Sequence, residues 1–362
     1  MSLDSSSAWN GTRNEARRLK RPKGVLRWSD VPTLIAAALF GALAGAFYRG
    51  VFDPEATRTL ANFLLSTANG LIVAVSMASA HRWLTRTASS WLRQRSLWTE
   101  LAMTGGVMVA TGSTVQLVVQ QVLFGASLAD ASALVPLHMA FALFLATVFL
   151  AGAHTIRLIG VGQFLSVLAG RYRRPVEEKR VLLFVDLKGS TRLAEHLGPV
   201  QVATLIARFF FDMDEIVAEH GGEVHAYIGD ELIVTWPTAE AVREAACLRC
   251  VFAMRGRVRE LARSYEAEFG VVPHFRAVLH SGPVVISEVG RARQQIGYFG
   301  DTMNVAARLE EHAKLVDRDL LISRLLAEQL ALPELFAVED LGQVELRGRI
   351  APVSVLALRR AC

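Results

Sequence analysis

Four long stretches in the first half of this chain carry no Asp, Glu, Lys or Arg, and they constrain its fold more than any other feature. They are Val31–Tyr48, Thr59–His81, Leu101–Ala129 and Ala131–Ile156. Each is close to or above the roughly 20 residues that an α-helix needs to cross a bilayer. A soluble domain would need four uncharged core helices in succession, which is rare. The pattern predicts an all-α, four-helix transmembrane domain over residues 31–159.

Basic residues flank these stretches mainly on one side. They lie before the first stretch, between the second and third, and after the fourth, at Arg13, Arg17, Arg18, Lys20, Arg21, Lys23, Arg27, Arg82, Arg86, Arg93, Arg95, Arg157, Arg171, Arg173 and Arg174. The positive-inside rule therefore predicts a multi-pass protein of the cytoplasmic (inner) membrane, with both termini in the cytoplasm. We expect residues 1–30 to be a retained basic cytoplasmic segment. The net charge of +5 then requires no nucleic acid partner.

The second half has the mixed composition of a globular domain. Residues 160–179 are predicted to form a helical linker that stops before Pro175, and residues 180–362 one α+β domain. Strands are expected over 180–186, 273–281, 283–288, 294–299, 319–322, 335–341 and 352–358, with a hairpin over 223–236. Helices are expected over 190–197, 199–220, 238–264, 302–315 and 323–331.

Asp186 follows a run that is typical of a buried strand. Val181–Val185 is apolar and β-branched, and Gly189, Ser190 and Thr191 lead into a helix. A carboxylate at such a turn can bind a hard cation, and the free N–H groups of a helix start can face phosphate oxygens. The plain alternative is that Asp186 ends the strand and Ser190 caps the helix. A second carboxylate in a comparable place would favour a metal site.

Asp230 is that second carboxylate. It lies in "YIGDELIVTW", where a hairpin turn alone would explain it. Together with Asp186, however, it can place two carboxylates on a pair of divalent ions, about 3.5–4 Å apart in two-metal phosphoryl chemistry. We therefore expect two Mg²⁺ or Mn²⁺ ions in each site.

A third motif, "YFGDTMNVAARLEEHAK", puts Asn304 and Arg308 at i, i+4 on one helix face. An amide and a guanidinium so placed can orient a ribose and neutralise charge on a phosphate. A solvated ion pair of Arg308 with Glu311 or Glu310 is an equally simple interpretation. Two further motifs, "FRAVLHSGPVV" and "ELRGRIAPVSVLAL", supply other basic residues, among them Arg276 and Arg349.

The order and residues of these motifs resemble those of the catalytic domain of class III nucleotidyl cyclases, the adenylyl and guanylyl cyclases. The match covers Lys179–Arg359, with "FVDLKGST", "YIGDELIVTW", "FRAVLHSG" and "FGDTMNVAARLE" in family order. The resemblance implies a ferredoxin-like α+β fold and conversion of ATP to 3′,5′-cyclic AMP and pyrophosphate. It also implies a homodimer, because each nucleotide of the family lies between two such domains.

Carried over by motif position, the resemblance also assigns roles. The metal site would be Asp186, Leu187 and Asp230, and the catalytic residues Asn304 and Arg308, from the other protomer, with Arg349 where the family usually has a Lys. The phosphate contacts would be Lys188, Gly189, Ser190, Thr191 and Arg276.

The base-reading positions depart from the family. Adenylyl cyclases usually have a Lys at the position of Ala226 and an Asp or Thr at that of Gly297, and the guanine-reading Glu and Cys are absent too. His225 and Tyr227 are candidate substitutes, of which only one is expected to face the pocket, because neighbouring side chains of a strand alternate. ATP is favoured on family frequency. The alternatives are a cyclase for another nucleotide (cyclic GMP or a pyrimidine) and a degenerate domain acting as a nucleotide-binding regulatory module.

Histidines mark the membrane half. His81 and His154 fall near the cytoplasmic side of the predicted spans, and ionisable residues inside a membrane are candidate functional sites. A facing pair could ligate haem b, but a helix-packing role is favoured. The membrane domain would otherwise contact lipids and sense a lipid or quinone.

Overall fold

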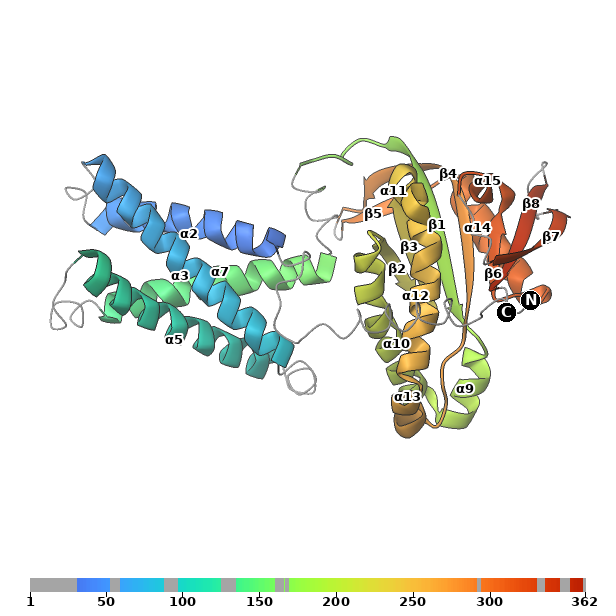
Figure 1. Ribbon diagram of the computed structural model, residues 1–362, viewed down its shortest axis with the longest axis horizontal. Coiled ribbons are helices and arrows are strands. Elements are labelled where there is room, and N and C mark those ends of the chain that lie inside the picture. The colour runs from blue at the N-terminus through green and yellow to red at the C-terminus, as the bar shows by residue number, and fades with distance from the viewer. Residues whose placement is uncertain are drawn as a thin grey trace, which may run out of the picture. The chain divides into compact units, whose positions relative to one another are not determined.

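The computed structural model describes residues 31–52, 59–87, 97–124, 135–159, 166, 169–291, 294–330, 336–345 and 352–360. The chain divides into two compact units, Met1–Leu158 and Ile159–Cys362, each of which is visible in Figure 1.

The described residues of the first unit form four helices, as the uncharged stretches predict. They are α2 (Val31–Phe52), α3 (Leu60–Thr87), α5 (Leu97–Phe124) and α7 (Val135–Ile159). Within the described residues, two of these helices are long and apolar enough to cross a membrane, over Leu60–Thr85 and Trp98–Val122. The apolar stretches of the other two, Leu34–Tyr48 and Met139–Thr155, are shorter. The expectation of four spans is therefore met by four helices but by only two full-length candidates.

Close helix packing joins α2 to α3. A Cβ atom at Gly41 or Gly45 would overlap the backbone of α3 around Gly70, so glycine is required where these backbones meet. Large apolar side chains nevertheless remain exposed along the first unit, including Leu39, Leu43, Phe47, Leu60, Leu64, Val122 and Phe144. Such continuous apolar exposure is what a lipid-facing surface requires.

One sheet organises the second unit. Its strands are β1 (Val176–Leu187), β2 (Glu223–Ile228), β3 (Glu231–Pro237), β4 (Phe275–Val289), β5 (Gln295–Phe299), β6 (Leu320–Ser323), β7 (Phe336–Val344) and β8 (Val353–Arg360). The order is β2-β3-β1-β4-β6-β8-β7, with β5 paired to β4. All pairs are antiparallel except β4 with β6. Strand β1 is buried from Arg180 to Leu187 because both of its edges and both of its faces are covered.

Helices cover the two faces of this sheet. Apolar side chains of α10 (Pro199–Glu219) and α12 (Ala246–Glu260) pack in one core with Val181, Leu183 and Val185. Those of α14 (Asp301–Leu315) pack in the other with Leu182 and Phe184, as the alternation of a strand requires (Figure 1). Shorter helices complete the unit: α9 (Ser190–Leu197), α11 (Thr238–Val242), α13 (Ala262–Phe269) and α15 (Arg324–Ala327), with the 3₁₀ turn η3 (Arg243–Ala245).

Two expected elements differ in the structure. The single helix predicted over 238–264 is broken, because Glu244 and Ala245 have φ angles of 50° and 52°. The two strands predicted over 273–281 and 283–288 form one strand, β4. Gly282 does not form a turn in this strand. A Cβ atom at this position would lie 2.5 Å from Thr302 Oγ1, so the absence of a side chain lets the start of α14 pack against the strand.

Candidate active site

Asp186 lies near the end of β1, between two neighbouring strands. It pairs with Glu231 on β3 and with Arg276 on β4, and it is only 5% exposed. Burial raises the pKa of Asp186, and the carboxylates of Glu310 and Asp230 raise it further, whereas Lys314 lowers it. The sheet therefore holds a carboxylate where isolation from water makes its charge costly.

A lysine partly neutralises this carboxylate. Lys314 Nζ, on α14, lies 3.2 Å from Asp186 Oδ1 and 2.5 Å from Glu310 Oε1. Both carboxylate side chains are largely buried, whereas the lysine side chain is 46% exposed. The cluster at the end of β1 thus already contains one cation, on the carboxylate expected to bind a metal.

Two further acidic residues belong to this cluster. Asp230 occupies the β2–β3 turn, close enough for its charge to act on Asp186. Burial, and then the Glu310 carboxylate, raise the pKa of Glu231 to about 7. In the described parts of the chain, no three His, Cys, Asp or Glu side chains form a ready metal-binding group. Asp186 and Asp230 with backbone oxygen fit Mg²⁺, which is usually held by one or two carboxylates plus substrate phosphates.

The turn after Asp186 has the shape needed to approach phosphate. Gly189 precedes α9 with φ of 70°, a left-handed conformation that favours glycine. Ser190 and Thr191 form the first turn of α9, where backbone N–H groups have no acceptor within the helix. Their side chains do not cap the helix, so the plain capping interpretation of Ser190 is wrong.

The two basic residues predicted to bind phosphate are both held by acidic residues of the α14–β6 loop. Lys188 Nζ pairs with Asp319 and lies 3.5 Å from Asp317 Oδ1. Arg276 Nη2 lies 3.0 Å from the same Asp317 oxygen. The hydrogen bond from Arg276, with the nearby Lys188 charge, lowers the pKa of Asp317. A phosphate at this turn would therefore compete with Asp317 for both side chains.

Asn304 and Arg308 are exposed on α14, one turn apart. Arg308 Nη1 lies 2.7 Å and 2.8 Å from the two carboxylate oxygens of Glu311, which is the ion pair that the spacing allowed. These side chains are thus free of the buried cluster around Asp186 and available to another molecule.

Strand β2, which carries the predicted base-reading position Ala226, has an irregular register. A bulge between Val224 and Ala226 changes the pairing of β2 with β3. His225 stacks on Tyr298 with ring centroids 4.1 Å apart, whereas Tyr227 packs on Phe210 of α10 and donates to Asp214. The two candidate substitutes therefore have different environments.

His225 is half-buried on β2 next to Ala226, and its burial lowers its pKa to about 4. Its Nδ1 atom is buried without a hydrogen-bond partner. The neighbouring position is closed to a side chain, since a Cβ at Gly297 would lie 2.7 Å from the Phe299 ring. An acidic base reader at position 297 would require that ring to move.

Three other predicted positions lie elsewhere. Arg349 is outside the described residues. His81 is buried against Phe149, with ring centroids 5.7 Å apart and the rings nearly perpendicular, and His154 is half-buried on α7. The contact of His81 is that of a helix-packing residue.

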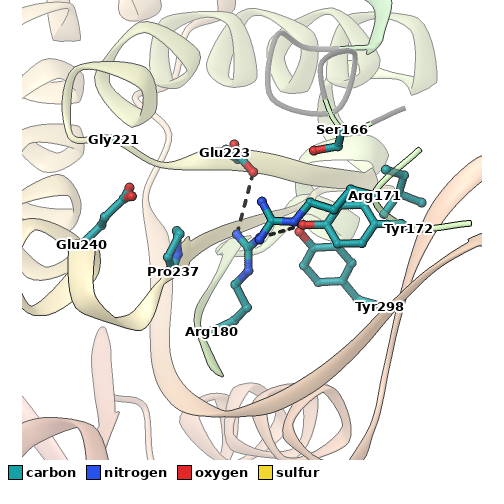
Figure 2. A pocket seen from close by; sticks show the side chains of 10 residues that line it. Ser166, Arg171, Tyr172, Arg180, Gly221, Glu223, Pro237, Glu240 and Tyr298 are labelled. Atoms are coloured by element: carbon teal, nitrogen blue, oxygen red, sulfur yellow. Dashed lines mark hydrogen bonds and ion pairs between the residues drawn. The ribbon is translucent and has the colours of Figure 1, made fainter. Parts of the chain in front are cut away.

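A separate cavity of about 200 Å³ lies at the opposite end of β1 and involves none of the predicted site residues. Arg180, with a side chain only 5% exposed, extends into it between the linker and β2 (Figure 2). Its guanidinium donates to Glu178 at 3.0 Å and to the Tyr172 hydroxyl at 3.3 Å, and it lies 3.8 Å from Glu223. This end of the unit therefore fixes the chain that leads into β1.

Residues 174–357, just over half of the chain, match the family described as the adenylate and guanylate cyclase catalytic domain. The chain belongs to this family. Adenylate cyclase 2 of Rhizobium meliloti (strain 1021) is 43% identical over 201 residues, covering 56% of this chain and 55% of that protein. Adenylate cyclase 1 of the same strain is 29% identical over 178 residues, covering 48% and 26%. The chain thus spans about half or less of these curated relatives.

The cyclase fold is also found among solved structures. A bacterial light-regulated adenylyl cyclase aligns with a TM-score of 0.51 and 19% identity, covering 63% of this chain and 65% of that one. This likeness concerns the fold alone, and it agrees with the mixed sheet and its helices.

Sequence reasoning missed three residues of the charged cluster around Asp186: Glu231, Glu310 and Lys314. Glu231 directly follows Asp230, and Glu310 and Lys314 follow Arg308 at i+2 and i+6 on α14. The i, i+4 spacing of Glu310 and Lys314 was visible as an ion pair. Nothing local in the sequence indicated that α14 would bring this pair to the end of β1.

Proposed function

We propose that this chain is a membrane-anchored adenylate cyclase that converts ATP to 3′,5′-cyclic AMP and pyrophosphate. The observation that carries the proposal is the convergence of Asp186 and Asp230 beside the glycine turn that starts α9. Family membership supports the reaction class, and the 43% identity to an adenylate cyclase supports ATP as the nucleotide.

In this reaction the ribose 3′-oxygen attacks the α-phosphorus in line, and the bond to the pyrophosphate oxygen breaks. Divalent cations held by Asp186 and Asp230, with the backbone at Leu187, would lower the pKa of the 3′-hydroxyl and neutralise phosphate charge. The N–H groups from Gly189 to Thr191 would hold the triphosphate. Lys188 and Arg276 would exchange Asp317 for phosphate oxygens as the nucleotide binds.

The active site is proposed to be shared between two copies of the chain. Asn304 and Arg308 are exposed and separate from the cluster around Asp186, so they are free to serve the site of a partner. In a symmetric pair each chain would supply one metal half and one ribose-phosphate half. Arg308 would stabilise charge that develops on the phosphate during attack, and Arg349 would be a further phosphate ligand.

Adenine recognition is proposed to depend on residues other than the family's usual Lys and Asp or Thr, which are replaced here by Ala226 and Gly297. Ala226 has no polar side-chain atom and Gly297 has no space for one. His225, held against Tyr298, is one polar candidate on β2 beside Ala226, whereas the hydroxyl of the other, Tyr227, already donates to Asp214. As a neutral imidazole it can donate and accept hydrogen bonds with a purine edge.

The first unit is proposed to anchor the enzyme in the cytoplasmic membrane. Two helices have the length and composition of membrane spans, and apolar side chains are exposed on all four helices. The basic flanks favour a cytoplasmic catalytic unit. The packing of His81 on Phe149 favours a structural role over haem ligation.

The decisive experiment incubates the purified full chain, in detergent, separately with ATP, GTP, CTP and UTP plus Mg²⁺ or Mn²⁺. Cyclic nucleotide and pyrophosphate are then identified by mass spectrometry. We expect cyclic AMP and pyrophosphate in equal amounts from ATP. Cyclic GMP as the main product would replace the nucleotide assignment, and no cyclic product from any of the four would favour a regulatory nucleotide-binding module.

A further inference from the structure

Lys314 and the proposed metal site use the same carboxylate, that of Asp186. Helix α14 ends one residue after Lys314 and places its ammonium 3.2 Å from Asp186 Oδ1. An ammonium and a metal ion on the Asp186 carboxylate would repel each other, because like charges a few ångströms apart in a partly buried site are poorly screened.

This ion pair differs from an ordinary surface pair in its burial. The Asp186 side chain is 8% exposed and that of Glu310 is 12% exposed, whereas Lys314 reaches them from a half-exposed position. Removing one partner of such a pair leaves a buried charge uncompensated, which is costly. Some cation must therefore accompany Asp186 whenever its carboxylate is charged.

Glu310 gives the ammonium a second partner. It precedes Lys314 by one helical turn, and Glu310 Oε1 lies 2.5 Å from Lys314 Nζ. Lysine carries its charge on a flexible stem with several rotatable bonds. The ammonium can leave Asp186 and keep its bond to Glu310 without any change in the backbone of α14.

We propose that Lys314 is an internal competitor for the divalent cation. Its ammonium neutralises Asp186 before the metal binds, moves to Glu310 when the metal arrives, and thereby weakens metal affinity while keeping the unloaded site folded. The inference rests on the proposed metal site at Asp186. It concerns the affinity for the ion, which family membership does not determine.

The main test measures Mn²⁺ binding to the full chain in detergent without nucleotide, by electron paramagnetic resonance of free Mn²⁺. In Lys314→Met the ion no longer has to displace an ammonium, so we expect its dissociation constant to fall about ten-fold, the effect of one charge-assisted bond. Lys314→Arg keeps the charge and should bind Mn²⁺ as weakly as the unchanged protein. Arg318→Met, which removes an ion pair to Glu339 away from the site, is the matched control and should change nothing.

Asp186→Asn separates failure of the inference from failure of the proposed function. Loss of Mn²⁺ binding in Asp186→Asn with tighter binding in Lys314→Met supports both. Loss in Asp186→Asn with unchanged or weaker binding in Lys314→Met overturns the competitor role and leaves the metal site intact. Unchanged binding in Asp186→Asn overturns the metal site and the inference together.

A second measurement needs no folded Lys314→Met protein. The chain has five lysines, so methylation with ¹³C-labelled methyl groups gives a small set of lysine signals, and Lys314→Arg identifies the one from Lys314. Titration with diamagnetic Mg²⁺ should shift the Lys314 signal, whereas the Lys179 signal should stay in place. A Lys314 signal that does not respond to saturating Mg²⁺ would contradict the displacement.

Discussion

The middle and the C-terminal end of α14 present their charges in opposite settings. At its C-terminal end Lys314 meets carboxylates that the sheet has buried, whereas one and a half turns earlier Arg308 pairs with Glu311 in the solvent. The proposed metal half of the site is thus built into the core of one chain, and the proposed ribose-phosphate half lies on an open helix surface. A catalytic group on an open surface needs a second molecule to exclude water and position it, so this difference favours a composite site.

Replacing Asp186 by Asn should have the largest effect. The change keeps the shape of the side chain but removes the charge on which the proposed metal depends. We expect cyclic AMP formation to fall by at least about 1,000-fold, equivalent to about 4 kcal/mol of transition-state stabilisation. Product should be measured at saturating Mg²⁺ and ATP, with size-exclusion chromatography to establish that the variant is folded. Activity within ten-fold of the unchanged enzyme would contradict the assignment.

Replacing Arg308 by Ala should have the next largest effect, and on activity only. Loss of one charged group that acts on the transition state typically costs about 100–1,000-fold in kcat. Stability should hardly change, because the Arg308–Glu311 pair is exposed to solvent. Urea unfolding and steady-state rates, measured on the same preparation, test both statements. Equal losses of stability and activity would mean that α14 itself was damaged.

Mixing chains tests whether the two halves come from different molecules. Chains with Asp230→Ala and chains with Arg308→Ala should each be nearly inactive. Random pairing of equal amounts should restore one intact site in half of the dimers, or about a quarter of full activity. Tagged chains, co-purified, would establish that heterodimers formed. No recovery in proven heterodimers would place both halves in one chain.

A smaller effect is expected at His225, where burial lowers the pKa to about 4. The folded protein then binds this proton more weakly than the unfolded chain does. Stability conferred by the neutral ring is therefore lost as the pH falls from about 6.5 to 4, by at most about 3 kcal/mol. His225→Phe keeps the stacking on Tyr298 but cannot titrate, so its urea unfolding should depend less on pH in this range. Parallel pH dependences of the two proteins would contradict this role.

The smallest effect is expected at Glu311. Because the Arg308–Glu311 pair is exposed at both ends, Glu311→Gln should alter the free energy of unfolding by less than about 0.5 kcal/mol. Urea unfolding at low and high salt checks this. A larger, salt-independent loss would show that this face of α14 is not open in solution, which would weaken the contrast with Lys314.

Local patterns were sufficient to predict much of the catalytic unit. The strand that ends at Asp186, the hairpin turn at Asp230 and the helix carrying Asn304 were all visible, because each depends on periodicity and turn residues within a short window. The broken helix at Glu244 was not, since its left-handed residues are not the usual glycine or asparagine.

Long-range features could not be read in this way. The bulge at His225 depends on the partner strand. The proximity of Lys314 to Asp186 depends on how α14 crosses the sheet, because the two residues are 128 positions apart in the sequence. Gly282 shows the same limit, because the residue that requires glycine at this position, Thr302, lies on another element. Such contacts are properties of the assembled core.

Tyr172 has a practical consequence for anyone who shortens this protein. It is 6% exposed, it packs with the residues that support α14, and its carbonyl accepts a hydrogen bond from Glu288 N–H at 2.8 Å. A fragment that begins at Arg180, where the sequence alone would place the domain boundary, loses this ring and leaves a hole in the core. Loss of a buried aromatic side chain costs about 3–5 kcal/mol, a large part of the stability of most domains. A fragment that begins at Gly170 keeps the ring and should give the more soluble and more crystallisable catalytic domain.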